Sequence, residues 1–169
     1  MIRAKKSLGQ NFLIDREVLE KITNVVQIKD KTILEVGPGT GNLTSFIIKK
    51  NPKKMFVIEK DDELAINLSE TFKDQLTIIN DDILQVDEKL IFKNKVTVFG
   101  NLPYNISTEI LIKLITQTKD NFWFNNLILM FQKEVADRII AKFNTSDYGR
   151  LSILRNWKLN VEKICDVKP

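Results

Sequence analysis

The stretch Lys-Thr-Ile-Leu-Glu-Val-Gly-Pro-Gly-Thr-Gly, residues 31–41, decides the fold. Its first half is apolar enough to predict a buried strand over residues 31–36. The glycines that follow allow a turn in which the backbone comes close to a ligand. Residues 43–48 then continue at helical spacing, and the helix is expected to stop at Asn51-Pro52. A strand, a glycine-rich turn and a helix in this order form a nucleotide-binding unit, because the start of the helix presents free N–H groups.

Acidic residues follow the next two apolar runs. Met55–Ile58 predicts a second strand that ends at Glu59, about 20 residues beyond the glycine turn, where an acid accepts hydrogen bonds from ribose hydroxyls. Asp61 and Asp62 are rivals for this role, although they are better suited to capping the helix expected over residues 63–72.

A third predicted strand, Leu76–Ile79, leads into Asn80, Asp81 and Asp82. A carboxylate at this place can meet the amino group of an adenine. The side chains of Asp81 and Asp82 alternate in direction, so one of the two can simply be solvated.

A fourth strand, Val96–Phe99, precedes the turn Asn101-Leu102-Pro103-Tyr104. Open α/β sheets bind ligands at the carboxyl ends of their strands. Pro103 stiffens the turn, Asn101 offers an amide oxygen as acceptor, and Tyr104 offers a flat ring for stacking. These groups suit a planar substrate with an exocyclic amine. The alternative is an ordinary proline turn, with the asparagine capping local backbone and the tyrosine half-buried.

The rest of the chain alternates between helical and strand patterns. Helices are expected over 15–26, with Asp15 as N-cap, over 107–118 and over 150–158. A strand is expected over 126–132, followed by a helix that buries Val135, Ile139, Ile140 and Phe143, and a sixth strand over 161–167. The order predicts one α/β domain over residues 1–169, a parallel sheet covered by helices on both faces.

The composition narrows the chemistry. With 43% hydrophobic and 28% charged residues, the chain has the make-up of an ordinary soluble globular domain, and a cytoplasmic monomer is the default expectation. No apolar run reaches the roughly 18 residues that a membrane span needs. The net charge of +4 and the basic start (Arg3, Lys5, Lys6) suit a polyanionic partner, or only a solvated terminus. The single cysteine excludes an internal disulfide and cysteine metal clusters. Because the chain also has no histidine, histidine triads and zinc hydrolysis are excluded as well. The chemistry that is left is carried by a cofactor or by carboxylates, with no metal.

Several motifs together resemble one family. Gly9–Leu13, Glu35–Thr44, Asn101–Ser107, Gln132–Ala136 and Tyr148–Ser152 occur in the same order in the ribosomal RNA adenine N6-dimethyltransferases. The resemblance covers almost the whole chain. It implies a Rossmann-like sheet that binds S-adenosylmethionine and methylates adenosines of rRNA.

The resemblance also implies roles for individual residues. It places Gly37 and Gly39 at the methionine end of the cofactor, with Gln10, Asn11 and Leu13 closing over it. Glu59 is expected to bind the ribose and Asp82 the adenine N6. Asn101 is expected to touch both the cofactor and the target.

The chemistry of the amine suggests a mechanism. The N6 lone pair of adenine is delocalised into the ring, so we hypothesise that the Asn101 side-chain oxygen and the Leu102 carbonyl accept hydrogen bonds from N6 and localise that pair. Tyr104 would stack on the extruded base. Phe131 is a candidate for the opposite face, although an aromatic on a strand is more commonly a core residue.

Within the family, Leu102 and Tyr148–Ser152 look more like the small-subunit branch, which dimethylates two adjacent adenosines near the 3′ end of 16S rRNA in a pre-ribosomal particle. Family members continue beyond this chain into a final strand and a small helical domain. We therefore expect residues 161–167 to lack a strand neighbour, and cofactor binding to survive better than RNA methylation.

Three rival interpretations stay open. The first is a large-subunit (23S) rRNA methyltransferase that confers antibiotic resistance, and the second an RNA-binding assembly factor with a vestigial cofactor site. A nicotinamide oxidoreductase is the third, but its G-x-G-x-x-G fingerprint does not fit the spacing of the glycines in residues 37–42.

Overall fold

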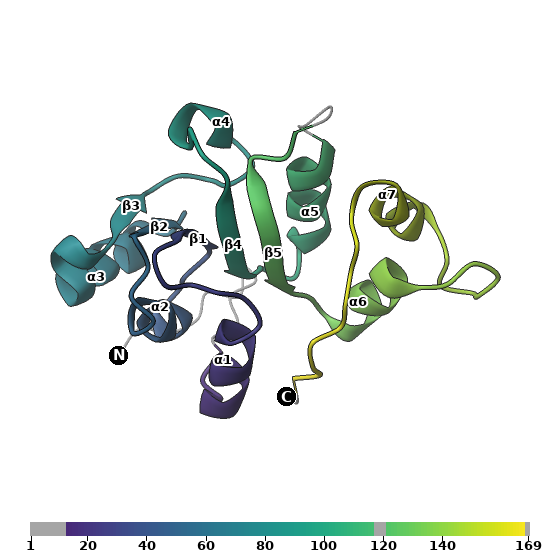
Figure 1. Cartoon of the computed structure of the whole chain (residues 1–169), viewed down its shortest axis with the longest axis horizontal. Coiled ribbons are helices and arrows are strands. Elements are labelled where there is room, and N and C mark those ends of the chain that lie inside the picture. Colours follow the sequence, from purple (N-terminus) through teal and green to yellow (C-terminus); the bar gives the residue numbers. More distant parts are fainter. Residues whose placement is uncertain (1–12, 117–120, 168–169) are drawn as a thin grey trace.

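The computed structural model describes residues 13–116 and 121–167, which form a parallel sheet with helices on both faces (Figure 1). The strand order is β3-β2-β1-β4-β5, and every neighbouring pair is parallel. The strands are β1 (Thr32–Val36), β2 (Lys54–Ile58), β3 (Thr77–Ile79), β4 (Val96–Asn101) and β5 (Phe124–Met130). This confirms the predicted Rossmann-like α/β fold.

The helices connect these strands as the sequence order requires. They are α1 (Arg16–Thr23), α2 (Asn42–Ile48), α3 (Asp62–Phe72) with the short 3₁₀ helix η2 (Lys73–Gln75), α4 (Glu88–Ile91), α5 (Ser107–Thr116), α6 (Lys133–Ile140) and α7 (Arg150–Lys158). Asp15 and Asp61 accept hydrogen bonds from backbone N–H groups at the starts of α1 and α3, as their predicted role as N-caps requires. Helix α4 was not predicted from the sequence.

The two faces of the sheet carry separate apolar clusters, because successive side chains of a strand point to opposite faces. Ile33 and Phe99 face α1 and α2, whereas Leu34 and Val98 face the side that α5 covers. The chain runs outward from β1 to β3 and then returns to the other side of β1 as β4. A crevice at the carboxyl ends of β1 and β4 is the usual ligand site of such a sheet.

Residues 161–167 do not form the predicted sixth strand. A strand needs a neighbouring backbone to pair with, and four side chains of residues 159–167 instead pack against the apolar clusters. Leu159 and Val161 pack against the cluster of α5, α6 and α7, while Ile164 and Cys165 pack on the α1–α2 side.

The predicted burial of Phe143 is also wrong. Helix α6 ends at Ile140, and Ala141 has an extended backbone, so the helical face does not continue to Phe143. The Phe143 side chain is 76% exposed and meets the Tyr148 ring edge-on, with 5.6 Å between ring centroids.

In residues 13–116 and 121–167, no helix combines the length and the apolar character that crossing a membrane requires.

Candidate functional site

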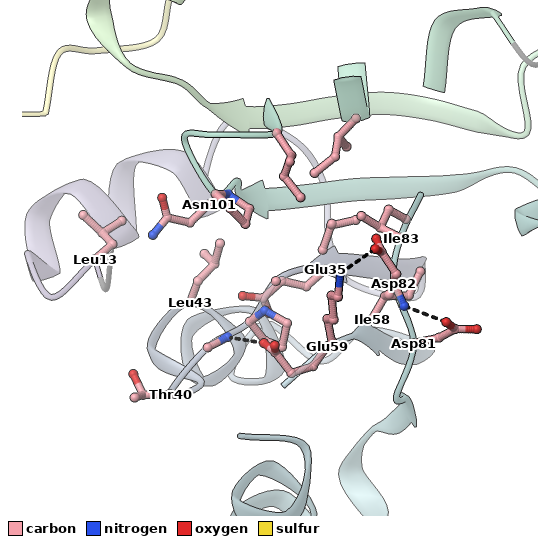
Figure 2. A pocket seen from close by; sticks show the side chains of 18 of the residues that line it. Leu13, Glu35, Thr40, Leu43, Ile58, Glu59, Asp81, Asp82, Ile83 and Asn101 are labelled. Atoms are coloured by element: carbon pink, nitrogen blue, oxygen red, sulfur yellow. Dashed lines mark hydrogen bonds and ion pairs between the residues drawn. The ribbon is translucent and has the colours of Figure 1, made fainter. Parts of the chain in front are cut away.

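A cavity of about 200 Å³ opens at the carboxyl ends of the central strands, between the glycine turn after β1 and the turn after β4. Figure 2 shows the side chains that converge on it from β1, β2, β4 and the loop after β3. The predicted cofactor residues within the described part of the chain all line it: Leu13, Gly37, Gly39, Glu59, Asp82 and Asn101. Gln10 and Asn11 lie outside the described residues.

The glycine turn places backbone against this cavity. Gly37, Gly39 and Gly41 all have positive φ, between 58° and 82°, a region that residues with a Cβ rarely adopt. Gly41 has a second constraint, since a Cβ there would come within 2.6 Å of the Phe72 ring of α3. The first two glycines therefore line the cavity, and the third packs α2 against α3.

Glu59, at the end of β2, holds the glycine turn in place through a hydrogen bond. Its Oε2 accepts a hydrogen bond from the Gly39 N–H at 3.1 Å (Figure 2), and its Oε1 accepts one from the Asp61 N–H at 2.9 Å. Burial raises the pKa of the Glu59 carboxyl, and these backbone hydrogen bonds oppose that rise. The carboxylate is thus fixed in direction before any ligand arrives.

Glu35 is a cavity residue to which sequence analysis gave no role. It is 1% exposed near the end of β1, and its Oε2 accepts the Thr44 hydroxyl hydrogen bond at 2.7 Å. Burial raises the pKa of Glu35 to about 8. The carboxyl is therefore largely protonated at neutral pH. The available signal was a carboxyl inside an otherwise apolar strand.

The two acids after β3 differ in their surroundings. Asp82 is half-buried, and its Oδ2 pairs with the Lys60 ammonium at 2.8 Å while its Oδ1 accepts the Leu84 N–H. Lys60 holds the pKa of Asp82 below its usual range. Asp81 is exposed and accepts the Asp82 N–H at 2.7 Å. Lys60 also lines the cavity, and sequence analysis did not single it out.

The turn after β4 is only partly in the cavity. Asn101, Pro103 and Asn105 line it, whereas Leu102, Tyr104 and Phe131 do not. The Leu102 side chain is buried, Tyr104 is 39% exposed, and Phe131 is partly buried against two apolar clusters. The packing of Phe131 fits the core alternative, and the catalytic roles of these residues stay predictions.

Among the described residues, no group of three carboxylate, cysteine or histidine side chains is placed to hold a metal ion. Three features define the class of Rossmann-like nucleotide-binding domains. The sheet is parallel with its chain reversal at β1 and β4, a glycine turn with positive φ follows β1, and acids follow β2 and β3.

Comparison with known proteins narrows this class. A family model described as ribosomal RNA adenine dimethylase matches residues 1–169. The chain is 66% identical over 168 residues to the ribosomal RNA small subunit methyltransferase A of Pelagibacter ubique (strain HTCC1062), covering 99% of this chain and 64% of that protein. The chain therefore belongs to the ribosomal RNA adenine dimethylase family.

Solved structures agree with this assignment. A dimethyladenosine transferase from Plasmodium falciparum superposes with a TM-score of 0.79 at 30% identity, over 92% of this chain and 55% of that one. The 23S rRNA methyltransferase ErmE superposes with a TM-score of 0.66 at 25% identity, over 83% of this chain and 53% of that one. The chain spans less than two thirds of the length of each of these relatives.

Proposed function

We propose that this chain is the cofactor-binding and catalytic domain of an S-adenosylmethionine-dependent rRNA adenine N6,N6-dimethyltransferase. The observation that carries the proposal is the single cavity that brings the glycine turn, Glu59, Asp82 and Asn101 together. The target that we propose is a pair of adjacent adenosines near the 3′ end of 16S rRNA, in a cytoplasmic pre-ribosomal particle, with the enzyme acting as a monomer. The 66% identity to a small subunit methyltransferase supports this branch.

The residues present fit S-adenosylmethionine. Carboxylates have about four acceptor positions, and Glu59 uses one on each oxygen for backbone N–H groups, so acceptor capacity is left for ribose hydroxyls. Asp82 stays ionised because Lys60 lowers its pKa, and an ionised carboxylate accepts a hydrogen bond from an adenine amino group. Gly37 and Gly39, which carry no Cβ, would hold the methionine end with their backbone.

S-adenosylmethionine supplies a methyl group carried on a positively charged sulfur. The task of the protein is to make the adenine N6 a better nucleophile. In our proposal the Asn101 side-chain oxygen and the Leu102 carbonyl each accept a hydrogen bond from N6, which draws the nitrogen toward a tetrahedral shape and localises its lone pair. No strong base is then required, in keeping with a chain that has no histidine.

Tyr104 is proposed to stack on the target adenine. Its ring is exposed next to the cavity-lining Pro103, and stacking on an aromatic side chain contributes about 1–3 kcal/mol per base. Phe131 would need to turn part of its ring out of the apolar clusters to cover the opposite face of the base. We therefore propose Tyr104 as the principal stacking residue.

A second candidate function is methylation of 23S rRNA, because the fold also matches ErmE at 25% identity. The assembly-factor alternative is less well supported, since the cavity keeps every predicted cofactor residue that the structure describes.

Calorimetric titration of the chain with S-adenosylmethionine tests the cofactor, with NAD as the control ligand and Asp82→Asn as the matched variant. We expect selective binding of S-adenosylmethionine that weakens about tenfold in the variant. Methyl transfer from labelled cofactor to isolated small or large ribosomal subunits that lack the modification then separates the two candidates. Binding of NAD instead, or labelling of 23S rRNA alone, would contradict the proposal.

A further inference from the structure

A lysine ammonium is buried beside the cavity, between two segments that are distant in the sequence. Lys113 lies on α5, and its side chain is 9% exposed. Its Nζ donates to the carbonyl oxygens of Ile83 and Val86 and to Oε1 of Glu88, the last at 2.7 Å. An ammonium has three hydrogens to donate, so these three acceptors satisfy it completely.

The two carbonyl acceptors, of Ile83 and Val86, belong to the segment that joins β3 to α4, and Glu88 is the first residue of α4. The start of that segment, Asp81 to Ile83, is one wall of the cavity, and Figure 2 shows Asp82 and Ile83 side by side there. The cavity wall formed by α5 includes Ile110, which lies one helical turn before Lys113. Lys113 therefore ties together two walls of the cavity that no strand pairing connects directly.

Burying the Lys113–Glu88 ion pair costs desolvation free energy. Glu88 is fully buried, and among the described residues its Oε2 has no hydrogen-bond partner. A buried ion pair commonly adds no more stability than apolar side chains of the same volume. What apolar side chains cannot do is donate to two backbone carbonyls and so fix the course of the loop after Asp82.

We infer that Lys113 is a positioning residue for the cofactor cavity, holding the Asp82–Ile83 wall at a fixed distance from α5. The inference rests on the proposed function in one respect, namely that this wall binds the adenine end of S-adenosylmethionine. Lys113 does not touch that ligand itself, and acts through the two carbonyl groups that it holds.

The test compares cofactor affinity with fold stability in a set of variants. Lys113→Met combined with Glu88→Met removes the carbonyl contacts without leaving a buried charge. Glu88→Gln keeps the carbonyl contacts of Lys113 and removes only the ion pair, and Lys113→Arg keeps a cation with several donors. Ile22→Ala, in α1 and away from the cavity, serves as a destabilised control.

Calorimetric titration with S-adenosylmethionine and with 5′-methylthioadenosine, well below the unfolding midpoint, gives the readout. We expect the double variant to bind both ligands about tenfold more weakly than wild type, since both carry adenine. Glu88→Gln should stay within twofold, Lys113→Arg within threefold, and Ile22→Ala should match wild type. If the double variant does not fold, Lys113→Gln, which has only two amide hydrogens, should still weaken both ligands by about threefold.

The outcomes separate the inference from the proposed function. If wild type does not bind S-adenosylmethionine, the proposed cofactor is wrong and the inference falls with it. If wild type binds but the Lys113 variants bind as well as Ile22→Ala does, the inference alone is wrong. A loss confined to S-adenosylmethionine, with 5′-methylthioadenosine unaffected, would also overturn it, because the effect would then lie at the methionine end.

Discussion

The two ends of the site are built in different ways. At the proposed cofactor end, the carboxyl groups of Glu35, Glu59 and Asp82 each have a defined hydrogen-bond partner, and two of the three are almost fully buried. At the proposed target end, Tyr104 is exposed and Phe131 is only partly covered. The first end is organised before a ligand arrives, whereas the second leaves surface that a large substrate can cover.

This difference suits two ligands of different size. A small cofactor gains affinity when its contacts are held in place beforehand, because little ordering remains for binding to do. An adenosine within RNA enters together with its backbone and neighbours, so the groups that meet it need to be accessible from outside. Asn101 lies where the two ends meet, since it ends β4 and also lines the cavity.

The largest expected effect is that of Asn101→Ala on methyl transfer. Loss of one acceptor for the N6 hydrogens should lower the single-turnover rate on small subunits at least about a hundredfold, the range found for removal of one group that stabilises a transition state. Cofactor affinity should fall less than about tenfold, because several other residues line the cavity. Asn105→Ala, in the same turn and also at the cavity, is the matched control. A rate within threefold of wild type would show that the mechanism is wrong.

A smaller effect is expected for pH-dependent stability, through Glu35. Its pKa is about 8 in the fold, against 4.5 for an unperturbed carboxyl, so between these values the folded chain keeps a proton that the unfolded chain loses. Stability from this group is therefore complete below pH 4.5 and declines as the pH rises toward 8. Between pH 5 and 7.5, the free energy of unfolding of wild type should fall relative to Glu35→Gln by about 2 kcal/mol or more.

Denaturant unfolding at a series of pH values measures this difference. The absence of histidine removes the usual source of titration in this range. Glu59 is present in both proteins, and in wild type its charge adds to the rise in the pKa of Glu35 that burial causes. Thr44→Val is a useful third protein. The Thr44 hydroxyl bond lowers the pKa of Glu35, so its loss should extend the decline to higher pH. Parallel pH curves for wild type and Glu35→Gln would show that the carboxyl is not perturbed by burial.

The gathering of Gly37, Gly39 and Glu59 at one edge of the sheet was predictable from the sequence, because its signals are local. Strand, glycine turn and helix follow one another within residues 31–48, and Glu59 follows its strand at the expected distance. Lys60 and Lys113 were not predictable in the same way. Their contacts join residues that are more than 20 positions apart, and periodicity reports only which face of an element is apolar.

The predictions that failed did so where a local pattern depends on a distant partner. Residues 161–167 were predicted to form a sixth strand, yet a strand exists only when another backbone pairs with it. Phe143 falls at the helical spacing of α6, but the helix has already ended at Ile140. Helix α4 is a single short turn with an Asp87 cap, too short for a periodic signal.

The smallest expected effect is that of Lys60→Met on cofactor affinity. Lys60 holds the Asp82 carboxylate by an ion pair at 2.8 Å, but its side chain is 57% exposed, and pairs of this kind contribute little. Removing the charge should weaken S-adenosylmethionine binding about threefold at low salt, because Asp82 loses its fixed direction. The difference should vanish near 0.5 M salt, where exposed charges are screened, and Lys60→Arg should bind like wild type.

The salt dependence decides where Lys60 belongs. A threefold loss that persists at high salt would mean that the lysine stem packs on the ligand and forms part of the organised end. A loss that salt abolishes places Lys60 on the accessible rim of the cavity, with Tyr104 rather than with Glu35 and Glu59. In that case burial, and not position along the sheet, decides to which end a residue belongs, because Lys60 directly follows Glu59 in the chain.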